Sequence, residues 1–374
     1  MKICIVTPKV VKGDGQGRAN YEIVWEAIRR NHHVTLLTKE LSPELEHHPS
    51  IEWIRFALPK LPTGLLEGIS FALYSSNWLK KYRSNFDLVQ VYGGVTFAPG
   101  DVNTAQFVHS SWLRSPVHIS RQNRNLYGAY HWLYTKLNAY WEKTAFQQAK
   151  VAIAVSKNIQ EQLLALGVPK DKIEVIFNGV DVEEFAPGDV SRARLGLPEN
   201  VTLALFVGDI RTNRKNLDTV LQALVEVREL HLAVVGSTEG SPYIELAREL
   251  GLAQRVHFLG YRLDVAQIMR GVDLFVFPSR YEPFGMVVSE AMATGLPVIT
   301  SAATGAAEIM TPDCGMVLPN TEDVASLAKA LRTITDDPQL RQKMGQTGQK
   351  IARQHSWASK AGNYLDLFEE LVPQ

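Results

Sequence analysis

The sequence predicts an α/β protein built from two domains, each with a doubly wound parallel sheet. First, 374 residues with 45% hydrophobic content exceed the usual size of one hydrophobic core. Second, short apolar runs that are typical of buried strands alternate with helical patterns. Third, this alternation stops in a segment rich in proline, glycine and charge, and restarts at residue 201. We therefore expect a first domain over 1–178, a linker over 179–200 and a second domain over 201–355.

The first half opens with a strand, a glycine-rich loop and a helix, which is the first unit of a doubly wound sheet. The strand is predicted at 2–7 and the loop at 8–18, and apolar residues from Ile23 to Ile28 recur at helical spacing. By itself the loop is equally typical of a tight turn. Further strands are predicted at 33–37, 51–56, 88–92, 104–108, 151–155 and 173–176.

The second half concentrates its chemistry in residues 278–299, between predicted strands at 273–277 and 297–300. Glu282 lies in a strand-to-helix loop. Pro283 biases the backbone of Glu282 to an extended form, and Gly285 allows a ligand to approach the chain closely. The helix is predicted to begin near Gly285. Its first free N–H groups, from Gly285 to Val287, carry the positive end of the helix dipole and suit a phosphate or diphosphate.

Two glutamates bracket this predicted anion site. Glu290 lies about 7.5 Å beyond Gly285 along the helix axis, at about 1.5 Å per residue. A carboxylate beside a phosphate repels it, so Glu282 and Glu290 are expected to bind neutral hydroxyl groups, as on a sugar or a ribose. A nucleotide-sugar has these three parts in this order: a diol on the sugar, a diphosphate, and a diol on the ribose. The alternative interpretation is that both are solvated acidic residues near a helix N-terminus.

Two further stretches place polar side chains at the carboxyl ends of predicted strands, where open parallel sheets bind ligands. In the loop 208–216, Arg211 and Lys215 are fixed cations that could clamp a diphosphate, unless the loop is an ordinary solvated basic surface. His109 directly follows the strand predicted at 104–108. A lone histidine in such a place is often structural.

Residues 111–150 differ in composition from the rest of the chain. Six basic residues accompany a single acid, Glu142, and seven tryptophans and tyrosines are interleaved with them. Such a segment could attach to an anionic membrane or recognise an acceptor. The alternative is a buried helical stripe, because one set of residues fits a single helix face: Leu126, Tyr130, Leu133, Leu137 and Trp141.

Charge and cysteine content exclude several classes of protein. A formal net charge of zero and a pI near 7.2 argue against a nucleic-acid-binding protein. The two cysteines, Cys4 and Cys314, have no metal-ligand spacing.

The N-terminal apolar run is too short for a signal peptide, and no run is long enough to span a bilayer. We therefore expect a cytoplasmic protein, soluble or peripheral on the cell membrane.

The stretch from Ser279 to Ile299 resembles the E-x7-E signature of the retaining nucleotide-sugar glycosyltransferases of family 4, with Glu282 and Glu290 as its two acids. The resemblance is close from residue 201 to about residue 315 and weaker before it. It implies the GT-B fold, in which two Rossmann-like domains face a cleft and a C-terminal helix, here 356–374, completes the first domain. It also implies transfer of a sugar, with retained configuration, from a nucleoside-diphosphate-sugar to a hydroxyl of a glycan, lipid or small molecule, with uridine the commonest base.

The resemblance further assigns roles to individual residues. His109 faces the transferred sugar, Lys215 and either Arg211 or Arg214 contact the donor phosphates, and Arg262 lies near the base. These roles make four residues candidates for catalysis: His109, Arg211, Lys215 and Glu282. The expected donor-binding residues are Gly15, Gly17, Arg262, Phe284, Gly285, Met286, Val287 and Glu290.

No metal or other cofactor is expected, because the chain has no Asp-x-Asp pair and its cations can neutralise the diphosphate. Two rival functions remain. A glycoside hydrolase needs two carboxylates flanking the bond, whereas Glu282 and Glu290 bracket an anion site. A nucleotide-sugar-binding protein without turnover is the other rival, and release of nucleoside diphosphate separates it from an enzyme.

Overall fold

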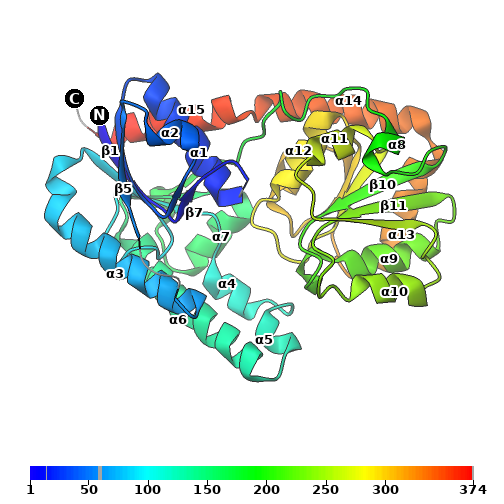
Figure 1. The fold of residues 1–374 in the computed structure, drawn as a ribbon, viewed down its shortest axis with the longest axis horizontal. Coiled ribbons are helices and arrows are strands. Elements are labelled where there is room, and N and C mark those ends of the chain that lie inside the picture. The colour runs from blue at the N-terminus through cyan, green and yellow to red at the C-terminus, as the bar shows by residue number, and fades with distance from the viewer. Residues whose placement is uncertain (14, 58–60, 373–374) are drawn as a thin grey trace. The chain divides into compact units, whose positions relative to one another are not determined.

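The structure is a computed structural model that describes residues 1–13, 15–57 and 61–372 (Figure 1). Contacts divide the chain into two compact units. Unit 1 comprises Met1–Gly179 together with the segment that begins at Trp357, and unit 2 comprises Val180–Ser356. Each unit contains its own parallel sheet.

The sheet of unit 1 has seven parallel strands among the described residues. In chain order they are β1 (Lys2–Val6), β3 (His33–Thr38), β5 (Ile51–Arg55), β6 (Leu88–Tyr92), β7 (Val102–Ala105), β8 (Val151–Ala154) and β9 (Ile173–Val175). Their spatial order is β5-β3-β1-β6-β7-β8-β9. The chain therefore winds outward from β1 in both directions, as predicted for a doubly wound sheet.

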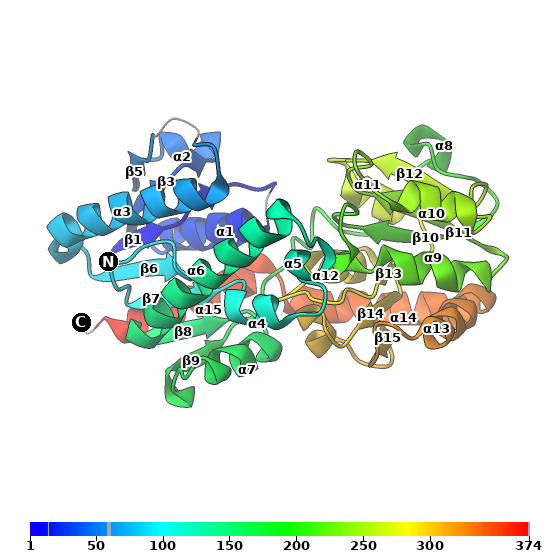
Figure 2. The ribbon, with the colours of Figure 1, turned by 90° about the horizontal axis from the view of Figure 1, so that it is seen from below.

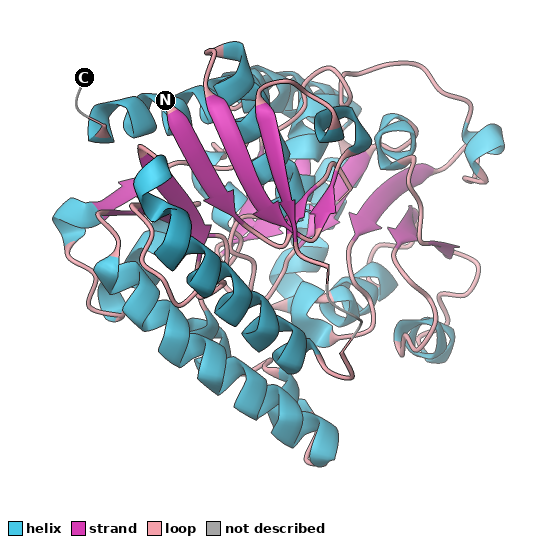
Figure 3. Cartoon of the chain, turned by 60° about the vertical axis from the view of Figure 1, so that its left-hand side comes forward, coloured by secondary structure: helices cyan, strands magenta, loops and turns pink. Residues whose placement is uncertain are grey.

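Helices cover both faces of this sheet (Figures 2 and 3). They are α1 (Gly15–Arg29), α2 (Pro43–Glu46), α3 (Gly64–Tyr82), α4 (His109–Arg114), α5 (Ile119–Gln122), α6 (Leu126–Gln148), α7 (Lys157–Ala165) and α15 (Trp357–Leu371). Alternate residues of β1 point to opposite faces. Ile3 and Ile5 share a core cluster with Phe368 of α15, whereas Cys4 and Val6 share another with side chains of α3.

Two local predictions for unit 1 were wrong. The segment 8–18 is not one loop, since Lys9–Val10 forms β2, which pairs with β4 (Glu40–Leu41), and α1 already begins at Gly15. The strand predicted at 104–108 is β7, which ends at Ala105, so His109 opens α4 four residues after the last strand residue. The first difference arises because β2 pairs with β4, a segment that is distant in the sequence.

The sheet of unit 2 has six parallel strands in the order β12-β11-β10-β13-β14-β15 within the described part of the chain. They are β10 (Thr202–Val207), β11 (Leu230–Val235), β12 (Val256–Gly260), β13 (Leu274–Phe277), β14 (Val298–Ser301) and β15 (Gly315–Leu318). The helices are α8 (Arg192–Leu195), α9 (Leu217–Val225), α10 (Tyr243–Glu249), α11 (Val265–Arg270), α12 (Met286–Thr294), α13 (Val324–Asp336) and α14 (Pro338–Gln354).

Of the expected linker 179–200, Gly179 belongs to unit 1 and residues 180–200 belong to unit 2. The guanidinium of Arg192 donates to the carbonyls of Gly271 and Val201 and to the carboxylate of Asp273, at 2.7 to 2.8 Å. Phe185 and Leu197 are buried. No described helix combines the length and apolarity needed to cross a bilayer.

Candidate active site

The loop 278–285, which carries Glu282 and which we call the signature loop, follows β13. The turn after β14 holds it in place. The backbone N–H of Glu282 donates to the carbonyl of Ala303 at 3.2 Å, and the N–H of Gly305 donates back to the carbonyl of Glu282 at 3.0 Å. Ala306 donates to the carbonyl of Phe284 at 2.7 Å. Sequence reasoning attached no role to this turn, yet it fixes the backbone from which the Glu282 side chain projects.

Gly285 makes the sharp turn from this loop into α12. Its φ is +90°, which side chains rarely tolerate, and a Cβ there would lie 2.8 Å from Cγ2 of Thr304. The helix starts at Met286, and the first helix-type hydrogen bond runs from Val288 N–H to the Gly285 carbonyl at 2.9 Å. By helix geometry, the N–H groups of Gly285, Met286 and Val287 therefore have no carbonyl within the helix to bind, as predicted for an anion site.

Lys215 forms an ion pair with Glu282 in this structure. Lys215 ends the short 3₁₀ turn η3 (Asn213–Lys215), 67 residues before Glu282. Both side chains are only 12% exposed, and the ammonium lies 5.0 Å from the ring centre of Phe277. Burial lowers the pKa of Lys215, and the carboxylate of Glu282 opposes that change. The predicted phosphate cation and the predicted sugar-binding acid are thus neighbours.

Two residues that sequence reasoning missed bind the η3 loop to the signature loop. Arg280 donates to both carboxylate oxygens of Asp218, at 2.8 and 2.9 Å, and also bonds Glu322. Its backbone N–H donates to the carbonyl of Arg214 at 2.9 Å. The buried Asn216, with a φ of +68°, donates to the carbonyl of Pro278 at 2.9 Å. In the sequence, the only sign of these roles is that Arg280 and Asn216 lie in loops that follow predicted strands.

The other predicted site residues of unit 2 differ in their exposure and in their partners. Arg211 is 57% exposed and its Nε lies 2.8 Å from the Asp209 carboxylate. Arg262 bonds Asp264 at 2.6 and 2.7 Å, just before α11. Glu290 is half-buried on α12, one turn beyond Met286. The structure therefore brings Lys215 and Glu282 into contact and holds Arg211 and Arg262 in separate local ion pairs.

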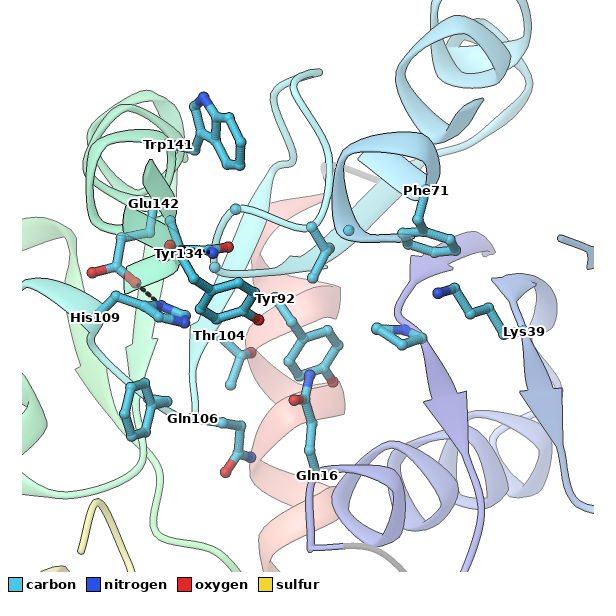
Figure 4. Close-up of a pocket in the computed structure, with 17 residues that line it drawn as sticks. Gln16, Lys39, Phe71, Tyr92, Thr104, Gln106, His109, Tyr134, Trp141 and Glu142 are labelled. Carbon is cyan, nitrogen blue, oxygen red and sulfur yellow. Dashed lines mark hydrogen bonds and ion pairs between the residues drawn. The ribbon is translucent and has the colours of Figure 1, made fainter. Parts of the chain in front are cut away.

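Unit 1 has a cavity of about 350 Å³ that contains His109 (Figure 4). Nδ1 of His109 lies 2.7 Å from the carboxylate of Glu142, which also accepts the backbone N–H of Ser110 at 3.0 Å. Glu142 is 1% exposed. Because a carboxylate can only accept, Nδ1 carries a proton, and Nε2 is an acceptor whenever the ring is neutral. The sequence showed Glu142 only as the single acid of a basic segment.

Aromatic and polar side chains from several elements line this cavity. The labelled ones in Figure 4 include Tyr92 at the end of β6, Tyr134 and Trp141 of α6, and Gln16 from the first turn of α1. Gly15 and Gly17 belong to the same first turn. The other lining residues are Pro8, Lys39, Gly68, Phe71, Gly93, Gly94, Val95, Thr104, Gln106, Phe107, His109, Asn138 and Glu142.

The buried-stripe interpretation of α6 was wrong for two of its five residues, whereas Tyr130, Leu137 and Trp141 are half-buried. Leu126 is 90% exposed and Leu133 is 44% exposed, although both belong to the stripe predicted for the core. The buried residues of the helix are instead Gly128, Thr135, Glu142 and Phe146. Helical periodicity predicted the helix but not the side that the rest of unit 1 covers.

The two halves of the chain match two described families. Glycosyltransferase Family 4 matches residues 13–184, and Glycosyl transferases group 1 matches residues 189–351. A curated relative, the D-inositol 3-phosphate glycosyltransferase of Corynebacterium kroppenstedtii, is 32% identical over 221 residues, which cover 54% of this chain and 49% of the relative. The chain thus spans about half the length of that relative.

Two solved structures are similar over nearly the whole chain. Sucrose-phosphate synthase from Thermosynechococcus elongatus has a TM-score of 0.82 at 22% identity, covering 99% of this chain and 98% of that one. HepE from Anabaena, solved in complex with UDP and glucose, has a TM-score of 0.71 at 21% identity, covering 99% of each chain. These likenesses confirm the predicted fold of two doubly wound parallel-sheet domains, the GT-B fold.

Proposed function

With both domains of a GT-B glycosyltransferase matched in one chain, we propose that this protein transfers a sugar from a nucleoside-diphosphate-sugar to an acceptor hydroxyl, with retained anomeric configuration. The observation that carries the proposal is the Lys215–Glu282 pair beside the N-terminus of α12. A buried cation and free N–H groups suit a diphosphate, and the adjacent carboxylate suits sugar hydroxyls. UDP is the proposed nucleotide, supported by the UDP complex of the structurally similar HepE.

In the proposed mechanism, Lys215 changes its partner when the donor binds. The diphosphate attracts the ammonium away from Glu282, and the carboxylate is released to accept hydrogen bonds from the transferred sugar. Lys215 and the N–H groups of Gly285, Met286 and Val287 then stabilise the negative charge that builds on the diphosphate as the glycosidic bond breaks. Arg211 or Arg214 is proposed to assist, and Glu290 to bind the ribose.

The cavity of unit 1 is proposed to hold the acceptor. Tyr134 and Trp141 offer ring faces for the apolar side of a sugar ring, and Gln16 and Asn138 offer hydrogen bonds to its hydroxyls. His109 presents Nε2 as an acceptor, and we propose that it contacts the transferred sugar. This lining favours a polyhydroxylated acceptor over an extended acyl chain.

Binding measurements on two variants test the donor site. Glu282→Ala should weaken binding of UDP-glucose but leave UDP binding unchanged or tighter, because only sugar contacts are lost and Lys215 is freed. Glu290→Ala should weaken both ligands about tenfold or more, the range for a lost hydrogen bond to a charged group. Titration calorimetry with both ligands distinguishes the roles, and equal effects of the two variants would contradict them.

Turnover distinguishes an enzyme from a protein that only binds nucleotide-sugars. A thermal-shift panel of nucleoside diphosphates and their sugars should first identify the donor, because a ligand of the native state raises the unfolding temperature. We expect slow release of nucleoside diphosphate from that donor even without acceptor. Binding without any release would favour the non-catalytic alternative. The anomeric configuration of an isolated product, measured by NMR, tests retention.

A further inference from the structure

Helix α6 presents two opposite faces with different chemistry. Tyr134, Asn138, Trp141 and Glu142 recur at helical spacing and line the cavity of unit 1. The opposite face is exposed along most of the helix. In Figure 1 this long helix runs along the lower edge of unit 1, near α3.

The exposed face is apolar and cationic. We call it the α6 stripe, and its members, spaced three and four residues apart, are Leu126, Ala129, Leu133, Lys136, Tyr140 and Lys143. Leu126 is 90% exposed and Tyr140 is 71% exposed. Trp132 lies beside the stripe, is 43% exposed, and has the Lys136 ammonium 4.5 Å from its ring centre. These apolar side chains contribute little to the core of unit 1.

The charge around the stripe has one sign. From residue 109 to residue 150 the single acid is Glu142, and it is buried against His109. The exposed basic residues in the same segment are Arg114, Arg121, Arg124, Lys136, Lys143 and Lys150, of which Lys150 pairs with Asp101. A partner that covers this face should therefore carry negative charge.

A lipid surface fits this combination better than a second copy of the chain. Two copies joined through their α6 stripes would place four lysines in one interface, because each copy contributes Lys136 and Lys143, and the stripe has no acid to pair with them. A bilayer interface accepts tyrosine and tryptophan rings at headgroup depth and lysine side chains that extend to the lipid phosphates. We propose that the α6 stripe is a docking surface for an anionic lipid bilayer.

Vesicle flotation of the full chain tests this proposal. The probes are vesicles of phosphatidylcholine alone and of phosphatidylcholine mixed with phosphatidylglycerol. We expect binding to the mixed vesicles that falls as salt is raised, and weak binding to the neutral ones. Quenching of tryptophan fluorescence by brominated anionic lipid should accompany binding, since Trp132 is exposed, and this readout requires no variant. Equal binding to both vesicles, or to neither, would overturn the proposal.

Matched variants assign the binding to the α6 stripe. Lys136→Glu/Lys143→Glu should lower partitioning into anionic vesicles about thirtyfold or more, from the attraction of two basic residues to such a surface. Lys329→Glu/Lys343→Glu makes the same charge change on exposed positions of α13 and α14 and should have less effect. Leu133→Glu should also reduce binding. Equal losses in both charge variants, or a dimer in light scattering that Leu133→Glu dissociates, would contradict lipid docking.

Discussion

At the scale of single residues, the proposed function depends on two pairs that are distant in the sequence. Lys215 and Glu282 form one pair in unit 2, and His109 and Glu142 form the other in unit 1. In each pair a buried or half-buried carboxylate is matched to a group that can carry positive charge. Such pairing permits an ionised carboxylate in a poorly solvated site, where an unpaired charge would be costly.

Lys215→Ala tests the cation at the proposed diphosphate site. One such charge stabilises a transition state by about 2.7 to 4 kcal/mol, so turnover should fall about 100- to 1000-fold. Steady-state kinetics of donor consumption measures the effect. Arg211→Ala is the comparison, because its guanidinium is largely exposed and already paired with Asp209. If Lys215→Ala keeps activity within about tenfold of wild type, the assignment is wrong.

Glu142→Gln tests how His109 is oriented. Glutamine can still accept the Ser110 N–H, but its amide N–H₂ group then faces Nδ1 of His109. Nδ1 must become the acceptor, so the proton moves to Nε2, the atom left to face the cavity. We expect turnover to fall at least about tenfold, by analogy with residues that orient metal-bound histidines. The unfolding midpoint should change little.

A double variant supplies the control for Glu142→Gln. If Glu142 acts through His109, then His109→Ala/Glu142→Gln should be no less active than His109→Ala alone. Additive losses in the double variant would instead show that Glu142 acts independently of the histidine.

At the scale of elements, the N-terminus of α12 is positioned by a glycine and by a neighbouring turn. Gly285 has the φ of +90° that this change of direction requires. An isolated β-bridge, formed by the backbones of Glu282 and Thr304, holds the signature loop against the turn that follows β14. The helix dipole is therefore directed by backbone contacts, not by the side chains of α12.

Gly285→Ala should damage this element. The added Cβ would lie 2.8 Å from Cγ2 of Thr304 and 3.0 Å from Cγ of Glu282, and its backbone would be strained. We expect a loss of about 1 to 3 kcal/mol in the free energy of unfolding, measured by chemical denaturation. Gly68→Ala is the comparison, because Gly68 lies within α3 and a Cβ added there would have no atom of the described residues within 4 Å beyond its own stretch of helix. It should raise the free energy of unfolding slightly, since alanine favours a helix. Equal effects of the two substitutions would contradict the conformational argument.

At the scale of the whole molecule, unit 1 is built from two separate parts of the sequence. Tyr364, Leu365 and Phe368 of α15 are buried in the same core cluster as β1 and α1. Arg30, directly after α1, adds ion pairs to Asp366 and Glu369. The C-terminal segment is thus part of the core of unit 1.

Phe368→Ala tests this arrangement. All seven tryptophans of the chain lie in unit 1, so tryptophan fluorescence reports the unfolding of that unit. Loss of a fully buried phenylalanine should lower the stability of unit 1 by about 3 to 5 kcal/mol. Leu331→Ala, in the core of unit 2, should cost about 2 to 5 kcal/mol in the circular-dichroism transition and leave the fluorescence transition nearly unchanged. Equal shifts of both signals by either variant would show that the units unfold together.

Local patterns in the sequence sufficed to predict much of the architecture. Apolar runs at β1, β6 and β13 predicted strands because a strand buried on both faces needs a continuous apolar run. The signature around Glu282 and Glu290 predicted a helix N-terminus suited to phosphate, because Gly285 and the residues after it determine that turn locally.

The sequence by itself thus determined the two parallel sheets, the signature loop and the candidate residues within it. Only the tertiary structure decided that Lys215 contacts Glu282, that Glu142 orients His109, and that Leu126 is exposed on α6. The physical reason is that periodicity describes an element and its two faces, whereas partner and burial depend on segments brought together by folding. Long-range contacts of this kind have no local signal in a single chain.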